Sequence, residues 1–164
     1  LKEKYIIYGC NALWRDFAPD ILFVVDDNML SEVHSSSYCK VHKVVSPCKY
    51  ICSEAKIISI EGKWKKWNCG SLAVLYACQK NPKNVYLAGF DVKYSNGKYK
   101  NIYAGTTHYA NQNSVEQRHV VKAEINQLTY CFQEFPEINF YRLYENNISE
   151  WESISNLTHI TTNI

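Results

Sequence analysis

The chain has 164 residues, a length that suits one compact domain burying roughly two thirds of its unfolded surface. Its 46% of apolar and 21% of charged residues are typical of a globular protein. A net charge of +2 is too small to indicate nucleic-acid binding, and no apolar run approaches the ~18 residues of a membrane span. The basic and aromatic cluster Lys63–Trp67 could touch phosphates, but a solvated loop explains it better.

The first half of the chain predicts four strands and one short helix. The strands are apolar runs bounded by turn residues, and Pro47 separates the last two. These elements are strands at 5–10, 21–25, 41–45 and 57–60 and a helix at 28–36.

Two longer helices are predicted in the second half. The helix at 70–80 stops before Asn81-Pro82, because proline disfavours helix in the residue that precedes it. The helix at 114–134 carries one apolar stripe and ends before Pro136. The other elements are a buried strand at 84–89, a long polar and aromatic loop at 92–112, a strand at 138–143 and, from 149, a short helix followed by strand or coil.

This order of elements indicates an α/β fold. Strands that alternate with helices and are apolar throughout favour a mostly parallel sheet covered on both sides. We predict a single Rossmann-like domain over residues 1–164, with the strands at 21–25 and 84–89 parallel and in one sheet.

The cysteines favour reduced thiols rather than a disulfide framework. There are seven, an odd number, scattered among apolar residues, which suggests a cytosolic setting. Cys39 and His42, followed by Cys48 and Cys52, have the residue types of a zinc site, but the gap between the pairs is too short for a common zinc knuckle. We therefore expect no metal. Cys69, at a helix start, is the one thiol placed for reactivity.

The segment Asn68–Ser71 is a glycine turn that opens the helix at 70–80. Backbone N–H groups at such a helix start bind anions, and the helix dipole adds roughly 0.3–1 kcal/mol in favour of negative charge. Gly70 has no Cβ to block a bulky anion. An ordinary capped helix explains the same residues equally well.

The strand at 84–89 ends in Gly89, and Asp91 follows. In open α/β sheets, ligands bind at the carboxyl ends of parallel strands. We therefore expect Asn11, Gly70 and Gly89 to converge on one cleft. For Asp91, a hydrogen bond to the loop backbone is a better explanation than a chemical role.

Four parts of the chain together resemble the Rossmann-type domain of the small bacterial sialyltransferases and, more closely, uncharacterised proteins encoded by marine bacteriophages. The parts cover most of the chain and are Tyr8–Asn11 with Val24–Asp26, Asn68–Ser71, Tyr86–Asp91, and Thr107–Tyr109.

The resemblance implies a metal-independent enzyme that moves a sugar from a CMP or other nucleotide donor to a hydroxyl of a glycan acceptor. It places Asn11 against the cytidine or ribose, and Gly70 and Ser71 against the phosphate. It assigns His108 as the general base, a role that suits an imidazole. Tyr103 and Tyr109 would donate hydrogen bonds to the departing phosphate.

Several of these residues also have simpler explanations. His108 is explained as well by an exposed loop histidine. Asp26 and Asp27 either bind a ribose or cap the helix that starts near Asn28, and we leave both alternatives open. His119 lies off the apolar stripe of its helix and is expected on the surface.

Two departures from the family limit the resemblance. Its Gly-Asn-Gly turn after the first strand is missing here, so either that strand and turn precede Leu1 or part of the nucleotide pocket is lost. The long insertion that closes over the acceptor is also missing. The leading hypothesis is a nucleotide or nucleotide-sugar binding protein of the host cytoplasm with glycosyltransferase ancestry. The rival is a non-enzymatic virion or host-interaction protein that contacts phage structural proteins.

Overall fold

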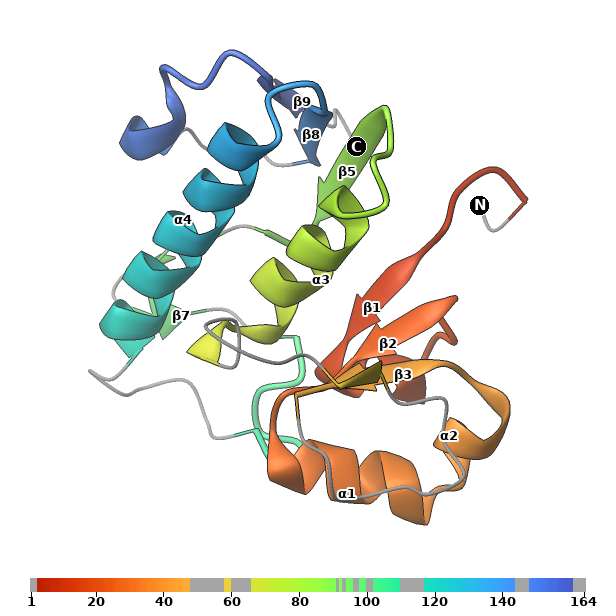
Figure 1. Ribbon diagram of the computed structural model, residues 1–164. Coiled ribbons are helices and arrows are strands. Elements are labelled where there is room, and N and C mark those ends of the chain that lie inside the picture. The colour runs from red at the N-terminus through yellow and green to blue at the C-terminus, as the bar shows by residue number, and fades with distance from the viewer. Residues whose placement is uncertain are drawn as a thin grey trace. The chain divides into compact units, whose positions relative to one another are not determined.

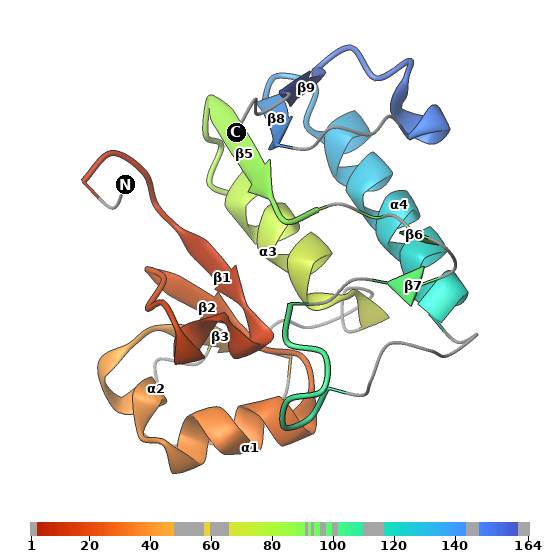
Figure 2. The same cartoon turned by 180° about the vertical axis from the view of Figure 1, so that it is seen from behind.

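The computed structural model describes residues 3–47, 58–59, 66–90, 92, 94–95, 98–99, 102–109, 117–143 and 148–160. The chain divides into two compact units, seen from opposite sides in Figure 1 and Figure 2. Unit 1 is Leu1–Ala73 with Gly105–Ala110, and unit 2 is Val74–Ala104 with Asn111–Ile164. Their boundary falls inside helix α3 (Cys69–Cys78). Within the described part of the chain, no helix is long and apolar enough to cross a membrane.

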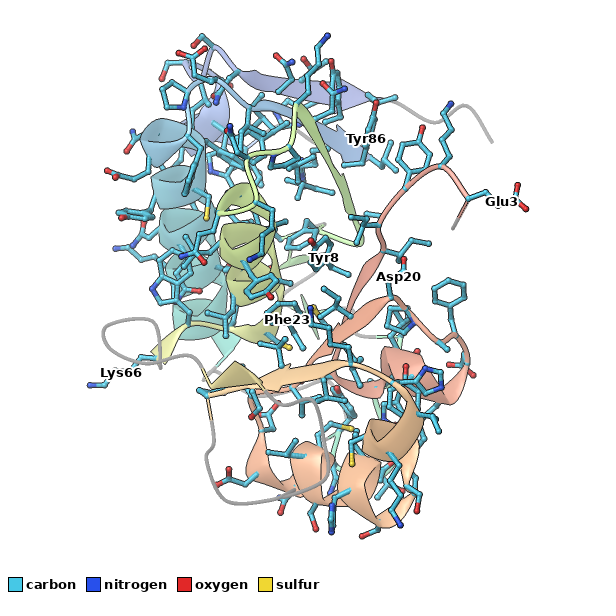
Figure 3. All side chains as sticks on the ribbon, turned by 45° about the vertical axis from the view of Figure 1, so that its right-hand side comes forward. Glu3, Tyr8, Asp20, Phe23, Lys66 and Tyr86 are labelled. Carbon is cyan, nitrogen blue, oxygen red and sulfur yellow. The ribbon has the colours of Figure 1, made fainter. Side chains whose placement is uncertain are left out.

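Unit 1 is built on a parallel sheet of four short strands in the order β1-β2-β3-β4. Its elements in chain order are β1 (Tyr8–Cys10), the 3-10 helix η1 (Asn11–Arg15), β2 (Ile21–Phe23), α1 (Asp27–Ser35), α2 (Tyr38–Val41), β3 (Val44–Ser46) and β4 (Ile58–Ser59). All residues of β2 and β3 are buried, as their apolar runs predicted. Tyr8 and Phe23, labelled in Figure 3, hold β1 and β2 together with ring centroids 6.2 Å apart.

Gly9 determines how closely β1 approaches the segment that follows it. A Cβ on Gly9 would lie 2.6 Å from Pro19 Cγ and 2.9 Å from Leu13 Cδ2, so a larger residue would push this segment away. Asp20, directly before β2, is tied to the residue before β1: its Oδ2 accepts a hydrogen bond from the Ile7 N–H at 2.7 Å. This packing sets the position of the residues that directly follow β1.

Unit 2 is built on a second parallel sheet, of three strands in the order β5-β8-β9. Its elements are β5 (Asn84–Ala88), β6 (Tyr94–Ser95), β7 (Lys98–Tyr99), α4 (Gln117–Glu134), β8 (Asn139–Leu143), the 3-10 helix η3 (Ser149–Trp151) and β9 (Leu157–Ile160). In its core, the Phe132 ring meets Phe140 and Trp151 edge-on, with centroids 4.8 and 5.4 Å apart. Val121, Leu128 and Phe132 are buried, which confirms the predicted stripe of α4.

The prediction of a single Rossmann-like domain, with the strands at 21–25 and 84–89 in one sheet, is not confirmed. β2 belongs to the four-stranded sheet and β5 to the three-stranded one. The run Val85–Ala88 predicted a strand buried on both faces, but only Leu87 is buried and Tyr86 is 46% exposed. What the structure confirms is a mixed α/β fold in which the strands of both larger sheets are parallel.

Two local predictions also need correction. The predicted strand at 41–45 begins only at Val44, because Ser37 takes a left-handed conformation (φ 62°) and residues 38–41 form the short helix α2. The predicted loop at 92–112 contains an antiparallel hairpin, in which Tyr94 pairs with Tyr99 and Ser95 with Lys98. The two strands of this hairpin are only two residues long and lie in a polar part of the sequence, so no apolar alternation indicated them.

Candidate functional site

Asn11 and Asp26 meet at the carboxyl edge of the unit 1 sheet. Cys10, the last residue of β1, pairs with Phe23, the last of β2, so the residues after both strands lie at one edge. Asn11 Nδ2 donates a hydrogen bond to Asp26 Oδ2 at 3.3 Å. Asp26 stands at the N-cap position of α1, but its side chain makes no hydrogen bond that caps the helix. The structure therefore does not support the capping role that was one of the two alternatives for this residue. Its carboxylate instead faces the end of β1.

The loop carrying His108 and Tyr109 reaches the same edge. Tyr109 is half-buried, and burial raises the pKa of its phenol, with the negative charge of Asp26 and the Cys69 thiol adding to the rise. A hydrogen bond from the Ala12 backbone and the charge of Arg15 lower it. The phenol is therefore protonated at neutral pH, keeps its O–H as a possible hydrogen-bond donor, and is near enough to Asp26 for that charge to act on its pKa.

Arg15 holds this loop in place. Its Nε and Nη2 donate to Glu32 Oε1 and Oε2 at 2.8 and 2.6 Å, the two-point geometry of a strong charge-assisted pair. Its other hydrogen bonds run to Thr106 Oγ1 from Nη1 and to the Thr107 carbonyl from Nη2, both at 3.1 Å. One side chain thus joins η1, α1 and the loop, which passes close to α1 in both Figure 1 and Figure 2.

His108 is placed by the tight turn in this loop. The Gly105 N–H donates to the Tyr109 carbonyl at 3.1 Å, and the Tyr109 N–H donates to the Thr106 carbonyl at 2.9 Å. His108 takes a left-handed conformation (φ 68°), which a residue other than glycine adopts only at some cost in strain. The result brings His108 Nε2 to 3.3 Å from Glu32 Oε2.

Glu32 carries a negative charge at this site. Its pKa is lowered from the ordinary value of 4.5, first by the hydrogen bond from Arg15 and then by the charges of Arg15 and His108, while desolvation opposes the shift. An ionised carboxylate only accepts hydrogen bonds. A hydrogen bond across the 3.3 Å between His108 Nε2 and Glu32 Oε2 would place the hydrogen on Nε2.

The start of α3 is capped as an ordinary helix. Asn68 Oδ1 accepts a hydrogen bond from the Ser71 N–H at 2.8 Å, which is the standard N-cap arrangement. Gly70 is the second residue of the helix, as predicted. Ser71 is fully buried, and its Oγ has no hydrogen-bond partner among the residues that the structure describes. Asn68 thus acts as a cap, while Ser71 Oγ and the start of the helix stay candidates for binding an anion.

Cys69 is buried, which argues against the reactivity that its place at a helix start suggested. Burial raises the pKa of this thiol well above its usual value, and its contact with Cys10 adds to the rise. Its Sγ donates to the Phe23 carbonyl at 2.8 Å. Burial outweighs the helix N-terminus, which would lower the pKa of an accessible thiol.

The described structure does not test whether the remaining predicted site residues reach this edge. Gly89 and Tyr103 belong to unit 2, so their convergence with Asn11 stays a prediction. Gly89 has φ 77°, and a Cβ there would meet no atom within 4 Å, so conformation rather than space calls for glycine. Asp91 and two of the zinc candidates, Cys48 and Cys52, lie outside the described residues.

The pattern of the sequence does not point to Arg15 and Glu32. They are 17 residues apart, and Arg15 is 92 residues from Thr107, so no periodic spacing links them. Their pairing follows from the packing of η1 against α1, which the sequence does not reveal. Only their opposite charges, on either side of a buried strand, are a sequence signal.

Comparison of the chain with family models, curated proteins and solved structures gives no match. Within the described ranges, no three metal-binding side chains form a group that could hold a metal ion.

Proposed function

We propose that this protein binds a nucleotide or nucleotide sugar at the carboxyl edge of the unit 1 sheet, and that it is a Rossmann-like protein of glycosyltransferase ancestry. The observation that carries the proposal is the hydrogen bond between Asn11 and Asp26 at that edge, with the Tyr109 phenol near enough for the Asp26 charge to raise its pKa. Asn11 Oδ1 is buried without a hydrogen-bond partner among the described residues. Since such a buried atom costs about 1–3 kcal/mol, a donor group on a ligand would stabilise it.

The hydrogen-bonding groups suit the nucleoside end of such a ligand. Asn11 Oδ1 and the Asp26 carboxylate are acceptors, which match ribose hydroxyls or the amino group of a base. The charge of Arg15 is already balanced by Glu32. The phosphate would therefore be held at the start of α3, where the resemblance places Gly70 and Ser71, rather than by an arginine.

In the transfer reaction, His108 is the proposed base. It takes the proton from the acceptor hydroxyl while that oxygen bonds to the anomeric carbon of the donor sugar. The bond from this carbon to the phosphate oxygen breaks, and its electron pair leaves on the phosphate. Tyr109, protonated at neutral pH, is a donor that can stabilise the charge that develops there.

Thermal unfolding with CMP, UDP and their sugars tests binding. A ligand at about 100 times its dissociation constant adds ~2.7 kcal/mol, which raises the melting temperature by several degrees in a domain of this size. Asp26→Asn should remove most of the rise, while its neighbour Asp27→Asn should retain it. A flat response to every nucleotide would reject the proposal and favour the non-enzymatic alternative.

Transfer itself is tested by His108→Ala. Once a donor has been found, this variant should lose turnover and keep the ligand-induced rise in melting temperature. Equal loss of both would contradict a role of His108 as the base.

A further inference from the structure

We propose that Glu32, held by Arg15, is a positioning residue for His108: it accepts the Nε2–H and leaves Nδ1 as the atom that takes a proton from substrate. The assignment of Nδ1 as the proton acceptor rests on the proposed function. The 3.3 Å distance between Glu32 Oε2 and His108 Nε2 stands on the structure alone.

The first step of the argument is the fixed orientation of Glu32. Arg15 grips both carboxylate oxygens, at 2.8 and 2.6 Å, so the side chain has little freedom to rotate. Oε2, the oxygen nearer to Arg15 Nη2, is also the one that lies 3.3 Å from His108 Nε2. Oε2 thus contacts two residues from different segments, Arg15 on η1 and His108 on the loop.

The second step is the chemistry of the imidazole. A neutral histidine has one nitrogen that donates and one that accepts, and the partner of one nitrogen decides which is which. Glu32 is an acceptor only, so a hydrogen bond across the 3.3 Å contact puts the hydrogen on Nε2 and leaves the lone pair on Nδ1. When Nδ1 gains a proton, the negative carboxylate stabilises the imidazolium that forms.

The third step is the cost of holding His108 there. The left-handed backbone at His108 is strained, and the surrounding turn is secured by Arg15 through Thr106 and Thr107. Arg15 therefore fixes both members of the pair, the carboxylate directly and the imidazole through the loop. An isolated surface ion pair would make no such hydrogen bonds to the loop.

The tautomer of His108 tests the proposal without any ligand. Long-range ¹H–¹⁵N NMR of the wild-type protein, above the pH at which the imidazole titrates, should show the hydrogen on Nε2 alone. The resonances are assigned by their loss in His108→Gln. A hydrogen on Nδ1 would overturn the proposal, and this result needs no variant of Glu32 that folds.

Glu32→Gln sharpens the test, because a glutamine can accept or donate at the same place. The variant should show a mixture of both tautomers at His108. Glu134→Gln, which removes an exposed carboxylate from α4 in unit 2, should leave the single tautomer unchanged. An identical tautomer in wild type and Glu32→Gln would show that Glu32 does not position the ring.

The role in transfer has a separate readout. For an active donor, Glu32→Gln should lower kcat about ten-fold or more while KM for the donor changes little. A flat nucleotide response would reject the proposed function but leave the tautomer result standing. A normal kcat in Glu32→Gln would overturn the positioning role itself.

Discussion

Arg15 of unit 1 and Arg142 of unit 2 each tie together segments that are distant in the sequence, but in different surroundings. Arg15 is partly exposed, pairs with the carboxylate of Glu32 and reaches the loop through two further hydrogen bonds. Arg142 on β8 is fully buried. Its guanidinium lies over the Trp151 ring at 5.3 Å from the centroid, and its Nε donates to the Phe90 carbonyl at 2.7 Å.

The difference separates a core contact from a site contact. Charge inside a core is tolerated only where hydrogen bonds and an aromatic face replace water, so Arg142 is expected to be decisive for stability. A partly exposed pair is screened by solvent and contributes little to stability. What Arg15 determines is the position of a loop. We therefore expect replacement of Arg142 by methionine to lower mainly the stability, and replacement of Arg15 by methionine to change mainly the position of the loop.

Arg142→Met should have the largest effect on stability. The variant keeps most of the side-chain volume but removes the donor to the Phe90 carbonyl and the charge over Trp151. We expect a loss of about 3 kcal/mol, which lowers the melting temperature by about 10 °C. Thermal unfolding followed by circular dichroism measures it, and a change below about 1 kcal/mol would contradict the assignment of Arg142 to the core.

Asn156→Ala should have the next largest effect. The Asn156 Nδ2 group lies 3.0–3.1 Å from the carbonyls of Phe132, Phe135 and Ile138, so one side chain satisfies the end of α4 and the turn that leads to β8. Its loss should cost about 1–2 kcal/mol in the free energy of unfolding. Denaturant unfolding measures the change.

Asn139→Ala is the matched control for Asn156. Its amide also donates to a main-chain carbonyl, that of Lys83, but at 3.3 Å and at an exposed position. Water replaces such a bond readily, so the cost should stay below about 0.5 kcal/mol. Equal losses in the two variants would show that burial is not what makes the Asn156 contacts strong.

Arg15→Met should change stability by less than about 1 kcal/mol and still release the loop. Hydrogen exchange at the Tyr109 N–H, which bonds the Thr106 carbonyl, reports the loop directly. We expect faster exchange there and unchanged exchange in the strands of unit 2. A large fall in the melting temperature without faster exchange at Tyr109 would reverse the comparison between the two arginines.

The elements that could be predicted from the sequence are those whose signals are local. The stripe of α4 and the proline after it located a helix, and the apolar runs of β2 and β3 located buried strands. The run Val85–Ala88 has the same composition, yet Tyr86 is exposed and stacks on Tyr141 with centroids 4.9 Å apart. A short apolar run does not reveal which of its faces the fold will cover, nor which strand it will pair with.

The candidate site divides in the same way. Asn11 and Asp26 could be predicted because each directly follows a predicted strand, and parallel strands bring such residues to one edge. Glu32 follows no such rule, since it lies in the middle of a short helix and is recognised only through Arg15 and His108. A contact between three segments depends on how they pack, and the spacing of residues in the sequence does not indicate that packing.

The smallest expected effect is on the pH dependence of stability, where the two arginines act in different ranges. The pKa of His159 is lowered, mainly by burial and also by the charge of Arg142, so the unfolded chain binds a proton more readily than the folded one. Stability from this residue is fully present above its ordinary value of 6.5 and declines as the pH falls below it. The pKa of Glu32 is also lowered, so its contribution is present above 4.5 and is lost as the pH falls through the lower value in the folded protein.

Denaturant unfolding between pH 7.5 and 4 should therefore show a decline that begins near 6.5 and that His159→Gln flattens, followed by a smaller one below 4.5 that Glu32→Gln flattens. If His159→Gln leaves the first decline unchanged, the contact between Arg142 Nη1 and His159 Nδ1, which lie 3.5 Å apart, does not couple the core of unit 2 to pH.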